Sequence, residues 1–126
     1  MKRVFVDANV LLELLLVRAK VAVVSQLFAE QEALVFVSPL SVHLCYHYCQ
    51  KENITAARLT DFFQDFRILD MDDYVVKLAQ KRYKGKDFED CLQAACAELG
   101  GCDEIITLDK QFVKYSGTKL PVTVLG

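Results

Sequence analysis

Hydrophobic residues along this chain occur in short continuous runs that are separated by longer stretches with helical spacing. The short runs are rich in β-branched and aromatic residues, which is typical of buried strands. They predict strands at residues 4–6, 34–37, 68–69, 104–108 and 122–125. The longer stretches predict helices at residues 10–16, 21–30, 39–52, 55–66, 72–83 and 91–99.

Residues at the ends of these segments support the helix assignments. Ser38 precedes Pro39, as expected for an N-cap followed by proline in the first helical turn, and Thr55 can cap the next helix. Gly100 and Gly101 follow the last predicted helix and are a natural stop. Strands that alternate with helices indicate a mostly parallel sheet covered on both faces. We therefore expect one α/β domain over residues 1–126.

Composition narrows this picture. A chain of 126 residues has the size of one domain, and its 53% hydrophobic content predicts one well-filled core. A net charge of −2 argues against a surface that binds nucleic acid everywhere, although a local basic strip is still possible. No apolar stretch is long enough to cross a membrane. The five cysteines have no CxxC spacing, so we expect free thiols in a reducing cytoplasm.

Acidic residues occur where predicted strands end or a helix begins. Asp7 and Asp109 each follow a strand, and Asp90 lies near the start of a helix, beside Asp87 and Glu89. Carboxyl ends of parallel strands meet at one edge of the sheet, where ligands commonly bind. Crowded carboxylates need a cation, and hard oxygen ligands select Mg²⁺ or Mn²⁺. The alternative interpretation is that these acids are helix caps and a turn residue.

Four blocks of sequence carry a resemblance to a known family. They are FVDANVLL at residues 5–12, DFEDCLQ at 87–93, IITLDKQF at 105–112 and PV at 121–122. In this order they resemble PIN-domain nucleases, particularly the toxin ribonucleases of bacterial toxin–antitoxin pairs. The similarity spans nearly the whole chain.

The resemblance implies cleavage of RNA that depends on Mg²⁺ or Mn²⁺. Asp7, Asp90 and Asp109 match the family's metal-binding and catalytic acids. Asn9 and Thr107 match supporting polar neighbours, and Asp87 and Glu89 are candidate outer groups. The resemblance also implies RNA as substrate, an antitoxin protein as partner, a homodimer, and a cytoplasmic location.

One position departs from the family pattern. The family usually has a glutamate early in the helix after the second strand, and Leu44 occupies that place here. A leucine removes one negative charge that would face the metal. The alternative function is therefore a catalytically degenerate PIN domain that binds RNA or a protein. If the alignment is correct, Leu44 should border the acidic site, with His47 or Tyr48 nearby.

A basic run precedes the second block of acids. Lys81, Arg82, Lys84 and Lys86 could contact RNA phosphates, or they could form a solvated helix end.

Two other sites are less favoured. His43 and His47 lie on a different helical face from Cys45 and Cys49, so a four-ligand zinc site is disfavoured. A phosphoaspartate enzyme with Asp7 as nucleophile would also use Mg²⁺. It usually has a second aspartate where Asn9 stands.

Overall fold

A five-stranded parallel sheet forms the centre of the molecule, which a computed structural model describes over residues 1–30 and 32–126. The strand order is β3-β2-β1-β4-β5, and every pairing is parallel. This confirms the predicted fold class. The strands are β1 (Lys2–Val6), β2 (Ala33–Val37), β3 (Arg67–Ile68), β4 (Glu104–Thr107) and β5 (Val122–Val124).

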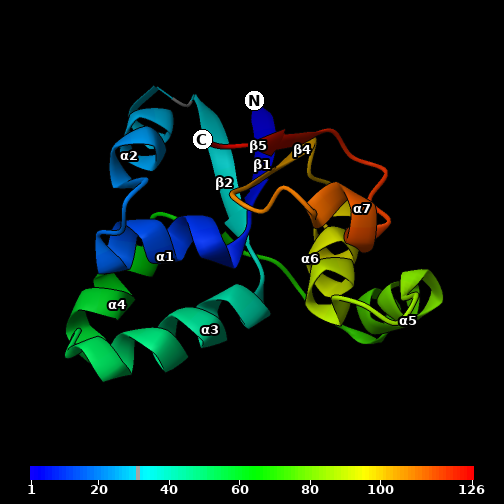
Figure 1. Ribbon diagram of the computed structural model, residues 1–126, viewed down its shortest axis with the longest axis horizontal. Helices are drawn as coiled ribbons and strands as arrows, with labels where there is room; N and C mark the ends of the chain where they lie inside the picture. Colours follow the sequence, from blue (N-terminus) through cyan, green and yellow to red (C-terminus); the bar gives the residue numbers. More distant parts are fainter. Residues whose placement is uncertain (31) are drawn as a thin grey trace.

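Helices cover both faces of the sheet (Figure 1). One group comprises α1 (Ala8–Leu16), α2 (Val21–Glu30), α3 (Pro39–Cys49) with the short helix η1 (Gln50–Glu52), and α4 (Ala56–Phe63). The other group comprises α5 (Asp73–Arg82), α6 (Phe88–Leu99) and α7 (Phe112–Ser116). Because β1 lies in the middle of the sheet, the residue after it comes close to both groups.

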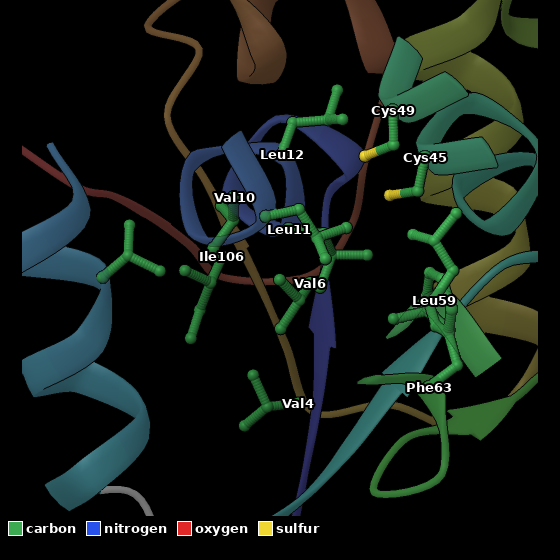
Figure 2. Packing of buried hydrophobic residues seen from close by; sticks show 13 residues of the cluster. Val4, Val6, Val10, Leu11, Leu12, Cys45, Cys49, Leu59, Phe63 and Ile106 are labelled. Carbon is green, nitrogen blue, oxygen red and sulfur yellow. The ribbon is translucent and has the colours of Figure 1, made fainter. Parts of the chain in front are cut away.

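Two hydrophobic clusters hold these layers together. Val4 and Val6 of β1 belong to the cluster beneath α1, whereas Phe5 belongs to the cluster beneath α6, as the alternation of side chains along a strand requires. Figure 2 shows the first cluster, in which Cys45 and Cys49 of α3 point toward α1. The five cysteines are free and buried, in agreement with the expected thiols.

Several predicted boundaries were wrong by a few residues. Helix α6 begins at Phe88 rather than near residue 91, and α4 ends at Phe63 rather than near residue 66. Strand β3 is shifted by one residue, because its pairing with Phe36 and Val37 of β2 fixes its register. Helix α7 was not predicted, since five residues are too few to show a helical period.

The helices are all short in comparison with a membrane span. Within residues 1–30 and 32–126, none combines the length and the apolar composition needed to cross a bilayer.

Candidate active site

Asp7 is held at the carboxyl edge of the sheet by the backbone and by its side chain. Its N–H donates to the carbonyl of Ile106 at 2.9 Å, which continues the pairing of β1 with β4. Its carboxylate accepts from the backbone N–H of Ala8 at 2.8 Å and from the Thr107 hydroxyl at 2.8 Å. The Asp7 side chain is only 3% exposed. It therefore caps α1, as the alternative interpretation required, and is also fixed beside β4.

Asn9 and Thr107 contact Asp7 directly. The Asn9 amide donates to Asp7 Oδ2 at 3.3 Å and to Thr107 Oγ1 at 3.2 Å. The backbone N–H of Leu108 donates to Asn9 Oδ1, and that of Asp109 donates to Thr107 Oγ1, both at 3.1 Å. This network links the start of α1 to the end of β4 and sets the position of the chain at Asp109.

The first turn of α6 brings two further acids to the same edge. Asp87 has a left-handed backbone with a φ of 52° and makes no side-chain cap, so the cap interpretation is wrong for this residue. Aspartate tolerates this backbone better than most residues. Glu89 and Asp90 follow in the first helical turn, and Asp90 is buried.

A pocket of about 350 Å³ contains the acids contributed by these segments. Asp7, Glu89, Asp90 and Asp109 line it together with Asn9. Asp87 and Thr107 are not among its lining residues. Leu44 and Tyr48 of α3 also line it, as the alignment of Leu44 with the family's glutamate required. The other lining residues are Ala8, Leu12 and Arg18.

The crowding of these carboxylates changes their acidity. Burial raises the pKa of Asp90 from 3.8 to about 7, and the neighbouring charges of Asp7 and Asp109 act in the same direction. Burial also raises the pKa of Asp7 to about 6, although hydrogen bonds from Thr107 and Ala8 oppose this change. Burial, followed by the charge of Asp87, raises the pKa of Glu89. The pocket therefore favours a bound proton or a bound cation.

The donor set fits a hydrated divalent ion. All candidate ligands are hard carboxylate oxygens, which suit Mg²⁺ or Mn²⁺ better than Zn²⁺. In the part of the chain that the structure describes, no three His, Cys, Asp or Glu side chains gather closely enough to enclose an ion by themselves. A Mg²⁺ ion usually keeps several waters and binds one or two carboxylates directly. Asp7, Asp90 and Asp109 could hold such an ion, partly through water.

Sequence reasoning missed several polar residues around Asp7. Gln93 is fully buried, and its amide donates to Asp7 Oδ1 at 3.4 Å and to Ser41 Oγ at 2.7 Å. The hydroxyl of Ser38 donates to Gln93 Oε1 at 2.5 Å. The signal for Gln93 was its spacing, because it lies three residues after Asp90 and so on the same side of α6. No sequence pattern pointed to Arg18.

The predicted basic run divides in the structure. Arg82 forms an ion pair with Glu98, with N–O distances of 2.6 and 2.9 Å. Lys84 and Lys86 line a second pocket together with Lys114, and Lys81 is exposed on α5 without lining that pocket.

The candidate zinc ligands on α3 also separate. Cys45 and Cys49 are buried, whereas His43 and His47 are exposed.

Comparisons with solved structures identify similar folds. VapC20 of Mycobacterium tuberculosis, described as a toxin that cleaves the sarcin-ricin loop, has a TM-score of 0.73 at 16% identity, over 88% of this chain and 93% of that one. VapBC2 of Rickettsia felis, solved with a DNA fragment from its promoter, has a TM-score of 0.68 at 14% identity over 96% and 98%. PAE2754 of Pyrobaculum aerophilum has a TM-score of 0.65 at 23% identity over 95% and 87%.

Sequence comparison gives the family itself. Curated protein sequences contain no significant match to this chain. The model of the PIN domain family matches residues 4–117, a range that includes Asp7, Asp90 and Asp109. Because this match covers most of the sequence and the parallel α/β fold agrees with it, the chain belongs to the PIN domain family.

Proposed function

We propose that this domain is a metal-dependent endoribonuclease that acts as the toxin of a toxin–antitoxin pair. The observation that carries the proposal is the pocket in which Asp7, Asp90 and Asp109 converge from three separate segments of a PIN domain. Similarity to VapC20, a toxin that cleaves the sarcin-ricin loop, supports RNA as the substrate.

The chain's own residues have distinct roles in this proposal. Asp7 is oriented by Thr107, Asn9 and Gln93, so its carboxylate keeps one position while the substrate binds. Asp90, in the first turn of α6, and Asp109, after β4, complete the proposed ligand set. A bound Mg²⁺ or Mn²⁺ would lower the pKa of a water and neutralise charge on the scissile phosphate. Arg18, at the edge of the same pocket, can approach a substrate phosphate.

The direct test is an RNA cleavage assay with the whole chain. With Mn²⁺ we expect cleavage of RNA by the unaltered protein. Asp7→Asn should lower the rate by at least about a hundredfold, because it removes a charge that acts electrostatically at the reacting centre. Melting curves of the variant establish that the domain is still folded. A folded Asp7→Asn variant that cuts as fast as the unaltered protein would contradict the proposal.

A second candidate function rests on Leu44. Leu44 lines the acidic pocket at the place where the resemblance puts the family's glutamate, so that carboxylate is missing from the pocket. This supports a degenerate PIN domain that binds RNA or a protein without cleavage. Absence of cleavage in Mg²⁺ and Mn²⁺, together with retained RNA binding, would favour this second function.

Protein partners form the remaining part of the proposal. The similarity to VapBC2 supports an antitoxin as partner. A cytoplasmic location belongs to the same proposal. Helix α2 is largely apolar, yet among its described residues only Val24 is buried, and Val23 is 43% exposed. Such a helix suits a protein contact, which supports a homodimer or an antitoxin complex.

A further inference from the structure

A second pocket, of about 460 Å³, lies where the end of α5 and the following turn meet α7. Its volume is within the usual range for small-ligand sites, about 300–1,000 Å³. Positive side chains dominate its wall, and none of the described carboxylates lines it. The lining residues are Arg82, Lys84, Gly85, Lys86, Lys114, Tyr115 and Gly117.

The lysines of this pocket are available to a ligand. Within residues 1–30 and 32–126, Lys84, Lys86 and Lys114 form no ion pair with a carboxylate. The ammonium groups of Lys86 and Lys114 each lie 5.3 Å from the centre of the Tyr115 ring. A ring face attracts a cation at this distance. Tyr115 thus lies beside two positive charges, which its ring attracts but does not neutralise.

The pocket has a fixed frame. Arg82 forms an ion pair with Glu98 on α6, which neutralises its charge. Its side chain lines the pocket. Gly117 has a φ of 68°, and a Cβ at this position would lie 3.0 Å from Cδ of Arg82, so the α7 end packs closely on that side chain. The thiol of Cys91 on α6 also donates to the carbonyl of Tyr115 at 3.2 Å, which ties α7 to α6. The lysines therefore project from a preformed surface.

Two of the segments that line the acidic pocket continue into this one. Lys86 precedes Asp90 by four residues, and Lys114 follows Asp109 by five. The chain can extend at most about 14 Å over the first interval and about 18 Å over the second. The basic pocket is therefore a near neighbour of the acidic pocket on the side of α6 and α7. Figure 1 shows these two helices next to each other.

We propose that this basic pocket is a phosphate-binding subsite for the RNA strand that continues beyond the cleavage position. Lys86 and Lys114 bind a backbone phosphate, and Tyr115 is the positioning residue that holds both ammonium groups. The inference rests on the proposed function, because it takes the acidic pocket as the place of cleavage. It adds Lys114 and Tyr115 to the predicted basic run and removes Arg82 from direct contact with RNA.

The first test measures binding of a short labelled single-stranded RNA at several salt concentrations, with a chelator present. Removing one lysine–phosphate interaction should reduce the slope of log K against log salt by about 0.7, so Lys86→Ala with Lys114→Ala should reduce it by about 1.4. A matched control, Lys2→Ala with Lys77→Ala, removes the same charge from two lysines outside both pockets. This control should leave the slope nearly unchanged. Equal slopes for the two double variants would overturn the subsite.

The second test separates the ring of Tyr115 from its hydroxyl. Tyr115→Phe keeps the ring and should retain the affinity and slope of the unaltered protein. Tyr115→Leu removes the ring and should weaken RNA binding, because Lys86 and Lys114 are no longer held together. An equal decrease in affinity in both variants would overturn the positioning role, because the effect would then not depend on the aromatic ring.

Cleavage in Mn²⁺ is measured on the same proteins and keeps the two proposals apart. Binding that depends on Lys86 and Lys114 without any cleavage would support the subsite and contradict the nuclease. Cleavage with a salt slope that does not depend on these lysines would support the nuclease and overturn the subsite. An unaltered protein that binds no RNA would also overturn the subsite.

Discussion

Leu44 lies on α3 between residues that line the acidic pocket and residues that are buried in the core. One helical turn later, Tyr48 lines the acidic pocket with it, whereas Cys45 and Cys49 on the adjacent face are buried in the core. Leu44 itself is half-buried. A longer, charged side chain at this position can therefore point into the pocket rather than into the core.

We expect Leu44→Glu to tighten Mn²⁺ binding, because it adds a carboxylate to a pocket that already holds four. It should also increase the rate of RNA cleavage. A Mn²⁺ titration combined with thermal melting measures both the gain in affinity and the cost in stability. The charge lies among like charges, so the metal-free variant should melt somewhat lower than the unaltered protein.

Val42→Glu is the matched control on the same helix. Val42 packs against the core, so a glutamate there should destabilise the domain by burying an unpaired charge, with no gain in metal affinity. If Leu44→Glu behaved in this same way, the idea that Leu44 replaces a metal-facing acid would be rejected.

For single residues, the placement of the acids at the sheet edge could be predicted from the sequence. The residues that form hydrogen bonds around Asp7 were harder to predict. Asp7 and Asp109 were predictable because both follow buried strands of a parallel sheet. Gln93, Ser38 and Ser41 form a buried network beside Asp7, with hydrogen bonds that join α3 to α6. Such interactions between distant segments depend on how the helices pack. A motif of consecutive residues does not contain this information.

Among the helices and strands, too, some could be predicted from the sequence and others could not. The strands were predicted from short continuous apolar runs, since both faces of a parallel sheet are covered. The long helices were predicted from their helical spacing, since burial of one face imposes it. Helix α7 has only five residues and depends on tertiary contacts: Phe112 is fully buried, and the carbonyl of Tyr115 accepts from Cys91. Its position also depends on the ion pair between Arg82 and Glu98, because Gly117 packs on the Arg82 side chain.

Arg82→Ala should therefore act on stability. Both partners of the pair are about one-seventh exposed, with side-chain exposures of 13% and 14%, and Glu98 also accepts from the backbone N–H of Lys119. Loss of Arg82 should cost about 2–3 kcal/mol of unfolding free energy, measured by chemical denaturation at neutral pH. Lys77→Ala breaks an exposed pair on the same helix and should cost no more than about 0.5 kcal/mol.

The loss of stability in Arg82→Ala should depend on pH if the ion pair with Glu98 causes it. Burial alone would raise the pKa of Glu98, but hydrogen bonds from Arg82 and from the Lys119 backbone lower it below its ordinary value of 4.5. The stabilisation is thus present above pH 4.5 and is lost as pH falls through the lower pKa of the folded state. The unfolding free energies of the unaltered protein and of Arg82→Ala should therefore become more similar in acid. A difference that persisted there unchanged would assign the loss to packing.

The whole molecule concentrates negative charge at one edge although its net charge is only −2. The folded state raises the pKa of Asp90 to about 7 and that of Asp7 to about 6, both from 3.8. A raised pKa means that the folded state holds the proton more tightly than the unfolded chain does. The resulting stabilisation is complete below pH 3.8 and is lost as pH rises toward 7. Without metal, these two groups make the domain less stable at neutral pH than in mild acid.

Mg²⁺ or Mn²⁺ should reverse this loss at neutral pH, because an ion that binds only the folded state stabilises it by mass action. The gain is about 2.7 kcal/mol at a concentration one hundred times the Kd. We expect the melting temperature at pH 7 to rise with either metal. It should rise much less near pH 4.5, because Asp7 and Asp90, whose pKa values are raised to about 6 and about 7, are then mostly protonated. Asp90→Asn should melt higher than the unaltered protein at pH 7 without metal, because it removes a buried carboxylate whose charge is opposed by those of Asp7 and Asp109. The same variant should lose most of the metal-dependent increase. These two effects have opposite signs and one cause, the crowding of carboxylates in the pocket. A variant that kept the full increase with metal would show that the ion binds elsewhere on the molecule.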